Sequence, residues 1–384
     1  MANSKSVHLL PNPSVANQAF TVAGNQTIIW DYIKNVLIKT LPDTPLQPRT
    51  FPSSATSVLL PLLAPKYSPT VLVCGGSSGD MPNPLALDDC YTINPQDGSP
   101  IWTPIDKLPN GPQTMSDGIL LPDGTVLILN GGRVGSGGGL MADKPVFQPV
   151  IYNPSAPAGA KFNTMPGSKI PRLYHSVATL LPSGEVFVAG SNPYVSYTPT
   201  GNVPSGYAPC SSRVFHKLTA SPLSWPYFYN NGHQCALNQQ QFKTSAYRTE
   251  YRVELFSPPY LSLPTPRPLI TALPAIIFYN TSFQLRAELA PDTPLLGQVQ
   301  IALLAPGFHT HGVAMGQRMV MLGFEASANA KIDEASANAA RVNSTKFTVE
   351  GPRDASVMPP GVYLFFVVYE GVPSQGRWVS VGGE

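Results

Sequence analysis

A repeated strand-turn-strand pattern constrains the fold of this chain more than any other feature of its sequence. In three segments an apolar strand ends in Leu-Leu-Pro, a turn follows, and a second apolar strand ends in Gly-Gly or Gly-Ser. Two of the turns, Asp123-Gly124 and Ser183-Gly184, supply the glycine that a tight hairpin with positive φ needs. The closing glycines recur about every 57 residues, near the kelch period of roughly 50 residues. The pattern predicts propeller blades over Thr56–Gly76, Ser116–Gly132 and Ser176–Ser191.

The composition agrees with an all-β chain of short strands and tight turns. The 384 residues include 43 Pro and 32 Gly, which stand between short apolar runs. The formal net charge is only +2 and no segment concentrates Lys and Arg, so we expect no nucleic-acid partner. The apolar run Val362–Tyr369 is far shorter than the roughly 20 residues that a membrane helix needs, so we expect no membrane partner either.

The repeats and the strands that follow them predict two parts. A more degenerate unit over residues 19–43 adds to the three repeats, so residues 1–261 are predicted to form about four blades. Strand-like segments without the repeated glycines predict a β-sandwich over residues 262–384. Residues 200–241 lose the strand alternation, and they form either a long surface loop or an insertion foreign to the fold, such as translated unspliced sequence.

The cysteines do not have the spacing of a zinc site. Cys74 and Cys90 could close a loop disulfide or remain a pair of buried thiols, and the other two are Cys210 and Cys235. We leave both alternatives open.

Two short motifs contain the candidate metal ligands. Tyr174 and His175 stand directly before a predicted strand, and both can reach one ion only if they lie in the irregular approach to it, because strand neighbours face opposite sides. His309 and His311 are spaced i, i+2, which predicts one face of a strand. The simpler interpretations are aromatic packing at a blade entrance and a polar sandwich face. Two imidazoles and a phenolate would form a donor set suited to copper.

Several stretches together resemble one family, the glyoxal oxidase-like copper radical oxidases, relatives of galactose oxidase. The resemblance implies a seven-bladed propeller followed by an immunoglobulin-like early-set sandwich, which sends a histidine into the central metal site. The stretches occur in the family's order and are Arg49–Leu62, Ile170–Pro193, Thr249–Leu261, Ala305–Arg318 and Pro359–Val381.

The resemblance also assigns roles to three of the candidate residues. It implies that Tyr174 is an axial tyrosinate and the catalytic base, and that His175 and His311 are imidazole ligands of one copper ion. His309 matches no ligand position of the family and remains a second choice.

The other half of the family's cofactor, a radical tyrosine cross-linked to a cysteine, has no counterpart in this sequence. The family's Arg-Trp-Tyr blade entrance is absent, Phe51 stands at the entrance of the first complete blade, and Cys74 lies on a second strand away from it. We therefore expect a form that lacks about three of the seven blades and the radical pair, as a truncated gene product would.

The resemblance implies an extracellular, monomeric oxidase that converts aldehydes or primary alcohols, with O2, to carboxylic acids or aldehydes plus H2O2. Residues 1–18 contain no secretory signal, and the absent radical pair predicts a truncated or inactive form. The main alternative is a non-catalytic kelch-type propeller and early-set protein that binds carbohydrate. An intracellular kelch adaptor that binds other proteins is a third hypothesis.

Overall fold

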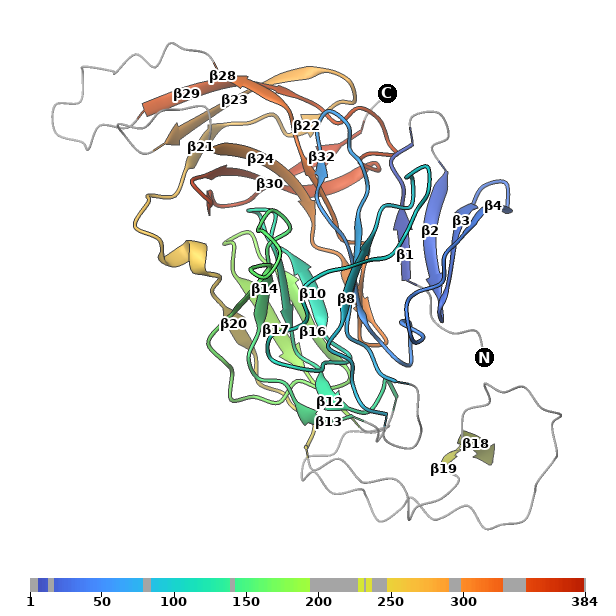
Figure 1. The fold of residues 1–384 in the computed structure, drawn as a ribbon. Coiled ribbons are helices and arrows are strands. Elements are labelled where there is room, and N and C mark those ends of the chain that lie inside the picture. Colours follow the sequence, from blue (N-terminus) through green and yellow to red (C-terminus); the bar gives the residue numbers. More distant parts are fainter. Residues whose placement is uncertain are drawn as a thin grey trace.

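The protein is built almost wholly from β-strands, as the sequence predicts (Figure 1). The computed structural model describes residues 6–12, 17–78, 84–138, 142–193, 247–289, 298–326 and 343–382, together with the backbone of residues 227–230 and 233–236. Within these ranges the only helical element is the short 3-10 helix η1 (Pro259–Ser262). In the same part of the chain, no helix has the length and apolar character that a membrane crossing requires.

Four antiparallel sheets follow one another along the first part of the chain, from blue through green to the yellow-brown of the last strand in Figure 1. In each sheet the strands pair in chain order, which is the meander of a propeller blade. Within the described residues three sheets have four strands and the last has three. The sheets consist of β1 (Ser6–Leu9), β2 (Gln18–Ala23), β3 (Gln26–Asp31) and β4 (Val36–Leu41); β5 (Thr56–Leu59), β7 (Val71–Cys74), β8 (Cys90–Ile93) and β9 (Thr103–Pro104); β10 (Asp117–Leu120), β11 (Val126–Leu129), β14 (Val150–Tyr152) and β15 (Phe162–Thr164); and β16 (Ser176–Leu180), β17 (Val186–Gly190) and β20 (Glu254–Phe256).

The two predicted hairpin turns have the expected backbone. Gly124 has a φ of 85° and Gly184 a φ of 86°, the left-handed region that glycine enters without steric cost. They join β10 to β11 and β16 to β17, whose strands pair with Leu120 opposite Val126 and Leu180 opposite Val186. The repeated local signal therefore encodes the inner hairpin of each blade.

Cys74 and Cys90 form a disulfide, which decides between the two alternatives that the sequence left open. They lie directly opposite each other on the neighbouring strands β7 and β8, with Cα atoms 4.1 Å apart. Both are buried in the core of the second sheet. Cys210 and Cys235 lie outside the residues whose side chains are described.

Replacing Cys74 and Cys90 together by alanine is expected to lower the free energy of unfolding by about 3 kcal/mol. The disulfide closes a loop with a sequence separation of 16, and closing a loop of this length restricts the unfolded chain by about that amount. Urea unfolding, followed by tryptophan fluorescence, measures the difference. A reducing agent should shift the wild-type midpoint but leave the double variant unchanged; an equal shift in both would contradict the prediction.

The second part of the chain is a sandwich of two sheets with a continuous apolar core between them. One sheet has the order β21-β23-β29-β28 and the other β22-β32-β30-β24-β27-β6, with β31 paired to β30. The strands are β6 (Leu62–Leu63), β21 (Leu269–Ala272), β22 (Ile276–Ile277), β23 (Ser282–Leu289), β24 (Val299–Ala305), β27 (Arg318–Met321), β28 (Phe324–Ala326), β29 (Asn343–Glu350), β30 (Gly361–Tyr369), β31 (Val372–Pro373) and β32 (Arg377–Val381).

The two parts are joined by shared structure. Strand β6, from the propeller segment, pairs in parallel with β27 of the sandwich, and one core cluster contains residues from both parts. The division of the chain after residue 261 therefore remains our proposal. The predicted insertion at 200–241 lies outside the described residues, apart from the backbone of the hairpin β18 (Tyr227–Asn230) and β19 (His233–Ala236).

A small hairpin of the second part reaches the first strands of the propeller sheets. It consists of β25 (Phe308–Thr310) and β26 (Val313–Met315). Strand β25 contacts β16, and β26 contacts β1, β5 and β10, so the hairpin touches the first strand of all four sheets. First strands surround the central axis of a propeller, and the hairpin turn is therefore delivered to that axis.

A further hairpin, β12 (Gly132–Val134) and β13 (Asp143–Pro145), follows the closing glycines of the third sheet. It lies at the end of the propeller opposite the sandwich (Figure 1).

Candidate metal centre

Three blade entrances use the same device to place a side chain near the axis. In each entrance one residue points towards the propeller axis. The polar residue two positions before it donates to a carbonyl at the end of the second strand of the same blade. Arg49 donates to Gly75 O (2.6 Å), Gln113 to Asn130 O (2.6 Å) and Arg172 to Gly190 O (2.7 Å). The corresponding axial residues are Phe51, Met115 and Tyr174, which belong to one small apolar cluster.

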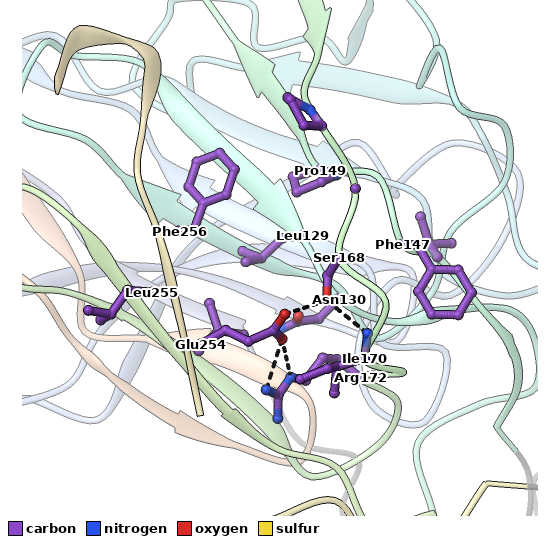
Figure 2. A pocket seen from close by; sticks show the side chains of 14 residues that line it. Leu129, Asn130, Phe147, Pro149, Ser168, Ile170, Arg172, Glu254, Leu255 and Phe256 are labelled. Carbon is purple, nitrogen blue, oxygen red and sulfur yellow. Dashed lines mark hydrogen bonds and ion pairs between the residues drawn. The ribbon is translucent and has the colours of Figure 1, made fainter. Parts of the chain in front are cut away.

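The anchor of the Tyr174 entrance is an ion pair between the buried Arg172 and the partly exposed Glu254. The Arg172 guanidinium donates through Nε (3.1 Å) and Nη2 (2.9 Å) to Oε2 of Glu254, the first residue of β20 (Figure 2). Ser168 also donates to this carboxylate. The pair borders a mostly apolar cavity of about 200 Å³ between the sheets of β10 and β16. Arg172 therefore ties the entrance to β17, through Gly190 O, and to β20, through Glu254. These bonds fix the backbone before Tyr174.

The structure brings the three predicted ligand residues together. The ring centroids of Tyr174 and His175 are 4.0 Å apart, and that of Phe51 lies 6.4 Å from Tyr174 and 5.0 Å from His311. Gly312 follows His311 in the hairpin turn, and a Cβ built on it would lie 3.6 Å from Tyr174 Cδ2. Tyr174 is buried, whereas both histidine rings are exposed.

Unusual backbone angles orient both histidines. His175 has a φ of 66° and His311 a φ of 55°, a region that few residues other than glycine adopt and that recurs at functional sites. Strand β16 begins only at Ser176, so Tyr174 and His175 lie in the irregular approach to the strand. The left-handed turn at His175 explains how two sequence neighbours present their rings to each other.

The Nδ1 atom of each imidazole has a hydrogen-bonding partner. His175 Nδ1 lies 2.8 Å from Asn192 O, and because a carbonyl only accepts, Nδ1 carries the proton and Nε2 a lone pair. His311 Nδ1 lies 2.7 Å from the Thr310 hydroxyl. Such partners fix ring orientation in metal sites. The sequence analysis did not identify Asn192 or Thr310, although Thr310 is the neighbour of a candidate ligand.

Burial raises the pKa of Tyr174 above its usual value, because desolvation disfavours the phenolate. The side chain therefore holds its proton at neutral pH in the metal-free protein. A cation bound beside the hydroxyl would favour the phenolate instead.

The prediction that His309 and His311 share one strand face is wrong. Strand β25 ends at Thr310, and the turn carries His311 towards Phe51 while His309 takes another direction. His309 Nε2 lies 3.1 Å from Asp117 Oδ1, with both side chains buried. The i, i+2 rule holds only within a regular strand, and the left-handed residue at the turn ends it.

The donor set fits a copper ion in type. Two imidazole nitrogens and one phenol oxygen are ligands that suit Cu(II). Among the described residues no group of three His, Cys, Asp or Glu could hold a metal, so a site here depends on the tyrosine.

The described residues do not fit the radical half of the family's cofactor. Phe51 has no hydroxyl, and the sulfur atoms of Cys74 and Cys90 are bonded to each other.

Comparisons with known proteins agree with the all-β fold and its two parts. The family described as Glyoxal oxidase N-terminus matches residues 5–207, and the one described as Galactose oxidase-like, Early set domain matches residues 267–381. Aldehyde oxidase GLOX1 of Arabidopsis thaliana is 34% identical over 379 residues, 94% of this chain and 52% of that protein. Aldehyde oxidase GLOX of Vitis pseudoreticulata is 30% identical over 385 residues, 98% of this chain and 61% of that protein.

A galactose oxidase of Gibberella zeae is 41% identical over a shorter stretch of 78 residues, 20% of this chain and 11% of that protein. The chain spans about half the length of the curated relatives it matches. The first family covers more than half of the chain, and the sandwich lies where the early-set family matches. The chain therefore belongs to the glyoxal oxidase family.

Proposed function

We propose that this protein holds one copper ion between Tyr174, His175 and His311. The observation that carries the proposal is the meeting of these residues at the propeller axis, where a hairpin of the sandwich brings His311 beside the Tyr174 entrance. Neither the Tyr174-His175 motif nor the motif that contains His311 indicates a metal site by itself, because each is also consistent with ordinary packing. The Nδ1 hydrogen bond of His175 and the left-handed backbone of both histidines give further support.

The residues of the site have separate roles in this proposal. Bound copper would supply an electron-accepting centre. His175 and His311 hold it through Nε2, and the phenol oxygen of Tyr174 is the third donor. Tyr174 is also the base that takes the hydroxyl proton of a primary alcohol or a hydrated aldehyde. Phe51 and Met115 form the apolar wall that keeps water from this proton.

The substrate class follows from the relatives, which are named aldehyde oxidases. We propose small aldehydes or primary alcohols, oxidised with O2 to acids or aldehydes plus H2O2 in complete family members. The two-electron reaction needs a second redox group besides copper. Because Phe51 and the Cys74–Cys90 disulfide cannot provide it, we propose that this 384-residue chain binds copper but releases little or no H2O2.

A non-catalytic binding protein with the same fold is the second candidate. Phe51 favours it, since an aromatic ring without a hydroxyl occupies the axial position of the first complete blade. Cell-wall carbohydrate is the partner that we propose for this case. The disulfide favours an extracellular location for both candidates, because such bonds persist in oxidising compartments.

Copper titration of the purified chain, followed by electron paramagnetic resonance, tests the metal site. We expect one equivalent of Cu(II) to give a tetragonal spectrum with nitrogen coupling. The copper-loaded protein is then incubated with methylglyoxal, glyoxal or a simple alcohol, and H2O2 is measured against free copper. Absence of stoichiometric binding would overturn the copper site. Azide-sensitive H2O2 release would overturn the assignment as a catalytically silent form.

A further inference from the structure

The hairpin that carries His311 is docked on strand β10 at both ends of that strand. At one end, the turn glycine Gly312 packs on Met115, with an ideal Cβ 3.6 Å from Met115 Cβ. At the other end, the Gln317 side chain accepts from Leu120 N (2.9 Å) and donates to Gly118 O (2.6 Å). The position of His311 at the axis therefore depends on how the hairpin lies against this strand.

Between these two contacts lies a buried polar pair, His309 and Asp117. The His309 side chain is 8% exposed and that of Asp117 is 1% exposed, and their facing atoms, Nε2 and Oδ1, are 3.1 Å apart. Neither atom makes a hydrogen bond with any described residue, so this close contact is the only polar contact recorded for either of them there. Burying either the carboxylate or the imidazole without a polar neighbour would cost folding free energy. Each side chain therefore needs the other close to it.

The carboxylate side of this pair is itself held in place. Asn130 Nδ2 donates to Asp117 Oδ2 (2.7 Å), and Gln113 donates to Asn130 O (2.6 Å). Gln113 is the polar anchor of the Met115 entrance described above. Asp117 is thus held by its own blade, and His309 is the buried polar side chain that the hairpin presents to it.

We propose that His309 and Asp117 form a positioning lock, which registers the β25–β26 hairpin on β10 and so sets His311 at the distance and angle that copper needs. His309 is two residues from His311 on the same short hairpin, so a shift of one moves the other. This inference rests on the proposed copper site. His309 is a positioning residue here and not a ligand, because its ring is turned into the interface with β10.

The test compares Cu(II) affinity and the spectrum of the bound ion in four proteins: wild type, His309→Ala, His309→Gln and Asp117→Asn. We expect His309→Ala to weaken Cu(II) binding by about 10- to 100-fold, the range known for partners that orient ligands. Its tetragonal spectrum should broaden, because His311 would sample several positions. His309→Gln can donate from an amide nitrogen near the position of Nε2 and should recover most of the affinity. Asp117→Asn keeps the shape of the side chain but removes its charge. Its Cu(II) affinity and spectrum test the pair from the side of Asp117, independently of changes at His309.

A control variant with a destabilising change at another site shows whether a loss of Cu(II) affinity comes from the position of His311 or from a general loss of stability. Tyr363→Phe removes a hydrogen bond to Pro359 O (2.6 Å) within the sandwich. It should leave copper affinity and spectrum unchanged. Affinity that falls equally in Tyr363→Phe and His309→Ala would overturn the lock, as would wild-type affinity and spectrum in both His309→Ala and Asp117→Asn. Failure of the wild type itself to bind Cu(II) would instead overturn the copper site.

Discussion

Replacing His311 by alanine is expected to weaken Cu(II) binding by more than about 100-fold, because loss of a ligand exceeds the 10- to 100-fold effect of losing a ligand's own partner. His175→Ala should weaken Cu(II) binding by a similar factor, because each of the two imidazoles supplies one bond to the same proposed ion. Both rings are exposed, and the surrounding core is left intact. Competition with a chelator of known affinity measures the binding constant, and paramagnetic resonance counts the coupled nitrogens.

A histidine outside the cluster provides the control for these variants. His8 lies on β1 and its Nε2 is 2.9 Å from the Ser57 hydroxyl. Burial, and after it the charge of Arg318, lowers the pKa of His8 to about 4, which marks it as a structural residue. His8→Gln should therefore bind Cu(II) as wild type does. A tetragonal signal that persists in the double variant His175→Ala/His311→Ala would show that copper sits elsewhere.

Replacing Arg318 by methionine is expected to destabilise the fold by at least about 3 kcal/mol. The guanidinium is buried and donates to three backbone carbonyls: Leu9 O (2.8 Å), Ser356 O (2.5 Å) and Val357 O (2.5 Å). Each buried acceptor left without a donor costs about 1–3 kcal/mol. Burial lowers the pKa of Arg318 to about 10, which keeps it charged at neutral pH. Because Leu9 ends β1 and Arg318 begins β27, the loss also loosens the first propeller sheet from the sandwich.

A neighbouring arginine offers a matched control for this prediction. Arg353 pairs with Asp354 (2.9 Å), with both side chains about one-third exposed. Such partly exposed pairs contribute at most about 1 kcal/mol, so Arg353→Met should change stability little. Urea unfolding compares the two variants with wild type. An Arg318→Met protein no less stable than Arg353→Met would refute the role of Arg318 as the link between the two parts.

The propeller could be predicted because its signal is local and repeated. An apolar run, a turn with glycine and a second apolar run each depend on a few adjacent residues, and Gly124 and Gly184 adopt the backbone that the sequence required. The disulfide could not be predicted in the same way. Whether Cys74 meets Cys90 depends on the register between β7 and β8, and the spacing of the two residues does not determine that register.

The candidate site shows the same limit. Tyr174, His175 and His311 were identified from motifs and family resemblance, but the sequence placed His309 beside His311 on one face. The turn after Thr310 separates them, and it is stabilised by contacts with Met115 and Asp117, which come from a distant part of the chain. The anchors Gln113 and Asn192 act through backbone carbonyls, and no residue pattern reveals which carbonyl lies within reach.

The sequence by itself determined the all-β class, the blade hairpins and the sandwich, because strand periodicity and turn glycines are properties of neighbouring residues. Family resemblance pointed to the three proposed donor residues. Only the tertiary structure decided that the three donors meet, that His309 turns to Asp117, and that Cys74 is bonded to Cys90. The physical reason is that these contacts join segments far apart in the chain. Their geometry is set by how the hairpin packs across four sheets and by the strand register within them.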